Sequence, residues 1–269
     1  MAKCFNNSLL KKDDMTVFYR GVNKVYPVET RHIPSLYYPP NEFYKHEKEI
    51  FEEVISVFPE EMLAQKTAVE KLFLMQHYRF PTRLMDMSKN PLIDLFFACF
   101  PDKGQQDASK DDGIVYTYTV PTDKIKFSSS HTVSMLSNLC KQHSSFLAND
   151  EDDLLRLGMD IMEERYAFEI KWMKEEDFNT VVCIRPRMNN PRIIRQAGYF
   201  LLFGVSGEKK NPAKIPNEWI GESISIPAKY KKSILEELNT MDYNEGFFYP
   251  DFEHVSNVLR RRYGKIGKC

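Results

Sequence analysis

The chain has 269 residues and lacks any close pair of cysteines. The spacings typical of zinc knuckles and of redox motifs are therefore absent. Thiols scattered in this way are typical of a reducing compartment. We expect a cytoplasmic protein with no bound metal. The five cysteines are Cys4, Cys99, Cys140, Cys183 and Cys269.

A long apolar run and an excess of basic residues are also missing. The longest apolar run, Leu92 to Phe100, is far too short to span a bilayer. The formal net charge is -1, whereas proteins that wrap nucleic acid usually carry a basic excess. The one dense basic run, at 260–262, is typical of a solvated helix end. We expect neither a membrane nor a nucleic acid as a partner.

Aromatic residues are abundant instead, with 19 Phe and 14 Tyr, and they predict a substantial core. No repeat, low-complexity tract or linker divides the chain, so we expect one domain over 1–269 with its core at about 15–262. Period-2 patterns predict strands at 15–21, 114–120, 180–184, 199–205 and 223–226. Helical periodicity predicts helices at 42–57, 60–78, 229–241 and 253–262, and helical structure within 131–179.

A further helix is expected from Asn90-Pro91. Asn can cap the free amides, and proline fits the first helical position. The following residues, LIDLFFACF, are apolar on almost every face. Such a pattern predicts a helix that is buried on most sides.

Four segments resemble the signature elements of the FRG-domain family. Residues 18–21 (FYRG) resemble its Phe-Arg-Gly signature, and 76–86 (QHYRFPTRLMD) resemble its long Gln-His-Tyr-Gly, Pro-Thr-Arg-Leu-Leu-Asp block. Residues 191–200 (PRIIRQAGYF) resemble its Gln-x-Gly-x-Phe element, and 248–251 (FYPD) its Phe-Pro-Asp element. The chain departs from the family pattern at Tyr19, Val22, Arg79 and Met87, where the family usually has Phe, Gln, Gly and Trp.

The layout also resembles ADP-ribosyltransferases. This resemblance implies an α+β fold with a mixed, mainly antiparallel β core flanked by helices, and an inserted helical segment near 131–179. It implies NAD as the substrate, with ADP-ribose transferred to a protein acceptor or the nicotinamide bond hydrolysed. A toxin-like effector in bacterial or phage conflict, acting in antiviral defence, would fit this character.

Three residues are the expected catalytic set: Arg20, His77 and Gln196. Arg20 lies at a strand end and suits bidentate phosphate binding, although a buried ion pair with Asp86 is an equal alternative. His77 is a candidate because a base of the histidine type is useful in a site. Gln196 stands where ADP-ribosyltransferases carry a carboxylate, and Glu169 or Asp251 are candidates to supply that charge.

Further residues are expected to bind the nucleotide-like ligand or to shape its pocket. They are Gly21, Tyr78, Thr82, Arg83, Asp86 and Ser88. Buried charges among them must be paired, so a structural polar network is the alternative reading. In that case the chain would be a non-catalytic nucleotide sensor or a protein-interaction module.

Overall fold

The computed structural model describes residues 14–101, 110–187, 194–196 and 198–249. Four sequence expectations lie wholly or partly outside these residues: the helix at 253–262, Asp251, the segment 191–193, and the thiols of Cys4 and Cys269. In the described part of the chain, no helix combines the length and the apolar character needed to cross a membrane.

The described residues build a mixed α+β fold around one seven-stranded sheet, whose order is β4-β5-β6-β2-β1-β3-β7. Neighbouring strands run antiparallel except for the parallel pair β4 and β5. The expected mainly antiparallel core flanked by helices is therefore confirmed. The strands are β1 Met15–Val22, β2 Leu84–Ser88, β3 Gly113–Pro121, β4 Ile125–Phe127, β5 Val181–Arg185, β6 Gly198–Phe203 and β7 Ile220–Ile226.

All five expected strands are present, and β2 is a further strand that is not among them. β4 was not expected, because three residues are too few to show an alternating pattern. β7 begins at Ile220 rather than at the expected Ser223, since the exposed Gly221 and Glu222 follow no apolar alternation.

The helices also follow the sequence pattern, with two corrections. The helix expected at 60–78 is broken into two, because the Thr67 side chain caps a new helix by accepting a hydrogen bond from the Glu70 amide. The helix expected at 42–57 begins as a 3-10 turn, Phe43–His46. The helices are α2 Glu47–Val57, α3 Pro59–Leu63, α4 Ala68–His77, α5 Pro91–Cys99, α6 His131–Asn138, α7 Glu151–Glu164, α8 Glu175–Phe178, α10 Ala228–Thr240 and α11 Glu245–Phe248.

α5 is the central helix that its sequence predicts. The Asn90 side chain accepts a hydrogen bond from the Leu92 amide at 3.0 Å, and Pro91 is the first helical residue. Six of the nine residues of α5 are buried, and Pro91, Leu92 and Phe97 are partly buried. The expectation of a helix buried on most sides is confirmed.

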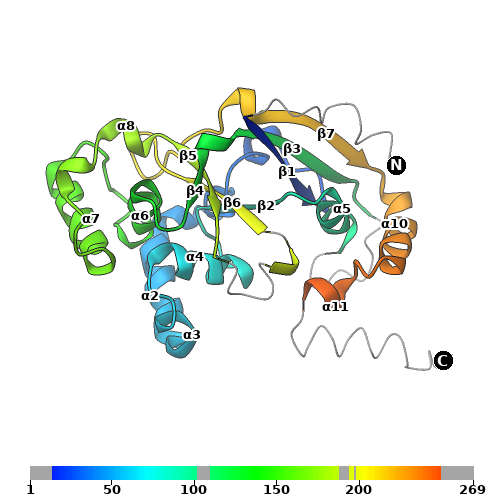
Figure 1. Cartoon of the computed structure of the whole chain (residues 1–269), viewed down its shortest axis with the longest axis horizontal. Helices are drawn as coiled ribbons and strands as arrows, with labels where there is room; N and C mark the ends of the chain where they lie inside the picture. The colour runs from blue at the N-terminus through cyan, green and yellow to red at the C-terminus, as the bar shows by residue number, and fades with distance from the viewer. Residues whose placement is uncertain (1–13, 102–109, 188–193, 197, 250–269) are drawn as a thin grey trace.

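Two separate groups of helices cover one face of the sheet (Figure 1). α2, α4, α6 and α7 pack over β2, β5 and β6, and α5, α10 and α11 pack with β1, β3 and β7. Side chains alternate along a strand, so Tyr19, Asp86 and Ser88 lie on this face. The opposite face holds a third apolar cluster that includes Phe18, Tyr118 and Trp219.

Candidate functional site

A cavity of about 310 Å³ lies between the two groups of helices. Phe73 and Phe80 line it from the first group, and Ile93, Phe97 and Phe100 line it from the second. Its volume is at the lower end of the range for small-molecule sites. The aromatic walls can hold a flat ring.

The floor of the cavity is the place where β1 and β2 separate. These two strands share one register pair, Tyr19 with Ser88, whereas β1 and β3 share eight. Beyond that pair, Gly21 and Asp86 line the cavity rather than continue the ladder. A Cβ atom at Gly21 would lie 1.7 Å from the Asp94 carbonyl oxygen, so glycine is required there by the close approach of α5. The absence of a side chain at Gly21 thus serves the packing of α5, and its expected contact with a ligand stays a prediction, since Gly21 lines the cavity.

A short chain of hydrogen bonds orients the Asp86 carboxylate in the cavity. The Thr82 hydroxyl donates to Gln76 Oε1 at 2.6 Å, and Gln76 Nε2 donates to Asp86 Oδ1 at 3.1 Å. Gln76 lies in the signature block but was not among the expected site residues. Thr82 is fully buried and does not line the cavity, so it acts by holding Gln76.

Asp94 is a second carboxyl group on the wall, which sequence reasoning missed. It is buried on α5, where its Oδ1 accepts the Gly21 amide at 2.9 Å and its Oδ2 lies 2.5 Å from Ser88 Oγ. Burial raises the pKa of Asp94 to about 8, which outweighs the hydrogen bonds that favour its charged form. The one polar residue in an apolar helix was the signal that could have identified it.

Arg79 brings a guanidinium group to the cavity. Its backbone is left-handed, with φ 65°, and its Nη2 donates to the Tyr249 hydroxyl at 3.4 Å. Left-handed backbone favours glycine, which is the residue that the FRG family usually carries at this point. The chain therefore accepts local strain where it places a cation at the cavity.

His77 and Gln196 both line the cavity, as do Gly21, Asp86 and Ser88 from the expected set. The His77 ring meets Tyr78 edge to face, with centroids 5.1 Å apart. Gln196 Nε2 donates to the Phe248 carbonyl oxygen at 3.4 Å. Residues from three distant segments thus share one pocket, and their chemical roles stay predictions.

Arg20 does not line the cavity. It leaves β1 on the opposite face from Gly21 and stands opposite Tyr116 in the ladder. The side chain is buried, and its Nε and Nη1 have no hydrogen-bond partner among the described residues. Burial lowers the pKa of Arg20, but the nearby Tyr38, Asp86 and Tyr118 outweigh burial and keep that pKa above its ordinary value.

Arg83 corrects the expectation that it binds a ligand. It is fully buried, and its Nε and Nη2 donate to the two carboxylate oxygens of Glu47 at 2.8 and 2.5 Å. Its Nη1 donates to the Phe203 carbonyl oxygen at 3.0 Å. The ion-pair partner of Arg83 is therefore Glu47. Tyr78 also lies outside the cavity lining, with 63% of its surface exposed.

The carboxylate expected from elsewhere in the fold is not Glu169. That residue forms an ion pair with Lys171 at the surface, away from the cavity lining. Among the described residues, which do not include Asp251, the carboxyl groups that reach the cavity are Asp86 and Asp94.

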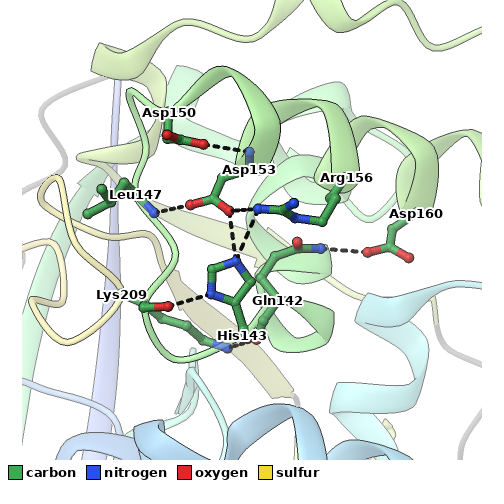
Figure 2. Close-up of polar contacts among 9 residues, drawn as sticks. Gln142, His143, Leu147, Asp150, Asp153, Arg156, Asp160 and Lys209 are labelled. Carbon is green, nitrogen blue, oxygen red and sulfur yellow. Dashed lines mark hydrogen bonds and ion pairs between the residues drawn. The ribbon is translucent and has the colours of Figure 1, made fainter.

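Figure 2 shows a second polar cluster, at the N-terminus of α7. His143 Nε2 lies 2.7 Å from Asp153 Oδ1, and His143 Nδ1 lies 2.8 Å from the Ser145 hydroxyl. Asp153 also accepts from Arg156 at 2.5 Å and from the Leu147 amide at 2.8 Å. Asp150 caps α7 by accepting the Asp153 amide at 3.0 Å, and the Asp153 carboxylate fixes the loop that enters the helix, so the cluster is structural.

Residues 15–107 match the family model of the FRG domain. This segment of the chain is an FRG domain. The match spans β1, β2 and α5, and so covers the place where β1 and β2 separate and both cavity carboxyl groups. Neither the curated proteins nor the solved structures provide a match to the chain.

Proposed function

We propose that the cavity of this FRG-domain protein binds a nucleotide of the NAD class and cleaves the bond between its ribose and nicotinamide. One observation carries the proposal: an oriented carboxylate, Asp86, faces a cavity with aromatic walls and a guanidinium group, that of Arg79. Aromatic rings suit a flat base, carboxylate and amide oxygens suit ribose hydroxyls, and guanidinium suits phosphate.

In this scheme the aromatic wall holds nicotinamide, and Asp86 faces the ribose carbon C1′. The C1′–N bond breaks, its electron pair stays on the nicotinamide nitrogen, and positive charge develops on the ribose. A carboxylate fixed by Gln76 stabilises that charge without needing to reorganise. Water or the nucleophile of a protein acceptor then attacks C1′. This places at Asp86 the charge that Gln196 cannot supply.

The remaining residues act on binding. Arg79 takes the phosphate contact that the sequence assigned to Arg20, because Arg79 lines the cavity and Arg20 does not. His77 and Gln196 contact the ribose. Arg20 adds positive potential from behind Asp86. Consumption of NAD in this way would suit a toxin-like effector in bacterial or phage conflict.

The test is release of nicotinamide from NAD, followed by chromatography, together with calorimetry of NAD binding. Asp86→Asn keeps the shape of the side chain and removes its charge. We expect it to bind NAD but to release nicotinamide about 100-fold more slowly. Glu169→Gln is the matched control, since it removes a carboxylate outside the cavity, and it should behave as wild type.

One observation favours a non-catalytic nucleotide sensor instead: the Gln196 amide is engaged by the Phe248 carbonyl oxygen rather than left for a ligand. Binding of NAD with no nicotinamide release by the wild type would select the sensor. Absence of both binding and release would overturn the assignment of the cavity to NAD.

A further inference from the structure

We propose that Asp94 is a positioning residue that works as a neutral carboxylic acid, holding the Gly21 amide on one oxygen and the Ser88 hydroxyl on the other. These two contacts join α5 to β1 and β2 beside their single register pair. Gly21, Ser88 and Asp94 all line the cavity. The proton on Asp94 would therefore fix the wall of the proposed site.

A count of hydrogens at Ser88 carries the inference. The Ser88 Oγ lies 3.0 Å from the Asn90 carbonyl oxygen and 2.5 Å from Asp94 Oδ2, and it accepts the Asn90 amide at 3.1 Å. A hydroxyl group has one hydrogen, so it cannot donate to both oxygens at once. If Asp94 carries a proton, Oδ2–H donates to Ser88 and Ser88 donates to Asn90. Every contact is then satisfied.

The contact of the other carboxyl oxygen of Asp94, Oδ1, is also consistent with a neutral acid. Asp94 Oδ1 accepts the Gly21 amide at 2.9 Å, as the carbonyl oxygen of a neutral acid does. A charged Asp94 would draw the Ser88 hydrogen away from the Asn90 carbonyl oxygen, beside the cap of α5. It would also place a buried charge without a bonded cation, which is costly.

The charged groups around Asp94 oppose one another. From β2, the Asp86 carboxylate disfavours ionisation of Asp94, and from β1 the Arg20 guanidinium favours it. From α10, the Lys231 ammonium group donates to the Asn23 carbonyl oxygen at 2.6 Å. His77 and Arg79 line the same cavity beyond the end of α4. Burial decides the balance and raises the pKa of Asp94 to about 8.

The first test is independent of any ligand. Carbon-13 NMR of the aspartate carboxyl groups of the full chain should show one that titrates near pH 8, and the signal should be missing in Asp94→Asn. If that variant does not fold, Ser88→Ala identifies the signal by moving it. Titration of Asp94 near pH 4 would overturn the inference.

The second test uses NAD as the probe, and it depends on the proposed function. Asn has an oxygen and an N–H group where the neutral acid has an oxygen and an O–H group, so Asp94→Asn should bind NAD as the wild type does at pH 7. Above pH 8 the affinity of the wild type should fall toward tenfold per pH unit, while that of Asp94→Asn stays level. Asp94→Ala should bind weakly at every pH.

Different results would overturn the role of Asp94 and the proposed binding of NAD. Equal losses in Asp94→Asn and Asp94→Ala, or a wild-type profile that is level up to pH 10, would overturn the role of Asp94. Absence of NAD binding at any pH, with a carboxyl group that still titrates near pH 8, would overturn only the proposed function and keep the neutral acid.

Discussion

Two buried arginines, Arg83 and Arg20, differ in how many of their guanidinium nitrogens form hydrogen bonds. Arg83 lies at the start of β2 with all three guanidinium nitrogens in hydrogen bonds, and Lys209 joins it on Glu47 at 3.1 Å. Arg20, which directly precedes the cavity-lining Gly21 on β1, has Nε and Nη1 without hydrogen-bond partners in the described part of the chain. The first region is a completed ion cluster and the second is not. A completed cluster supports the fold. The Arg20 charge instead acts at a distance on the cavity carboxyl groups of Asp86 and Asp94.

The largest effect should come from breaking the completed cluster. Arg83→Met should lower the free energy of unfolding by about 3 to 5 kcal/mol, because it leaves the buried Glu47 carboxylate without its bidentate partner. Denaturant unfolding of the two proteins, compared through their midpoints at equal slope, measures this difference.

Arg187→Met is the matched control for that variant. Arg187 pairs with Glu70 at 3.4 Å, but 66% of its side chain is exposed. The same substitution there should cost less than about 1 kcal/mol. Equal losses at Arg83 and Arg187 would show that burial does not distinguish the two pairs.

An intermediate effect on stability should come from the ionisation of Asp94. Its pKa rises from an ordinary 3.8 to about 8 on folding, so the folded state binds one more proton between these pH values. The stability that this proton gives is fully present below about pH 4 and is lost as pH rises toward 8, by up to about 1.4 kcal/mol per pH unit.

The difference in unfolding free energy between wild type and Asp94→Asn isolates this slope. Asn does not titrate, so the stability of the variant should gain on that of the wild type from pH 5 to pH 8. Thermal and denaturant unfolding at steps of one pH unit would measure it. Parallel curves for the two proteins would show that Asp94 has the same pKa when folded and unfolded.

The sequence predicted the helices and strands better than the side-chain pairings between them. β1, β3 and α5 follow directly from alternation, from the Asn90 cap and from apolar content. Convergence of Arg20, His77, Arg83, Asp86 and Gln196 was also predicted, because polar residues in apolar sequence need partners. The cavity brings together His77, Asp86 and Gln196 but not Arg20 and Arg83. These features depend on the local sequence pattern or on the requirement that buried polar groups form hydrogen bonds.

The pairings could not be predicted, because they depend on register and helix placement. The partner of Arg83 is Glu47, which lies 36 positions away in a helix whose sequence carries several acidic residues. Likewise, the local sequence does not show that the face of β1 with Gly21 borders the cavity while the face with Arg20 is buried on the other side of the sheet. Asp94 became a cavity residue only once α5 approached Gly21 closely.

The smallest change in stability should come from Arg20→Met. This substitution keeps an unbranched, apolar stem of similar length and removes a buried charge that forms no ion pair within 4 Å among the described residues. The folded protein loses no carboxylate partner, so unfolding free energy should change by less than about 1 kcal/mol.

The effect of Arg20→Met should appear in NAD binding instead. The Arg20 charge acts on both Asp86 and Asp94, so its potential reaches the cavity, and its removal should weaken NAD binding about tenfold. Calorimetry beside thermal unfolding separates the two outcomes. A loss of 3 to 5 kcal/mol in stability with unchanged affinity for NAD would place Arg20 with Arg83, as a second structural arginine.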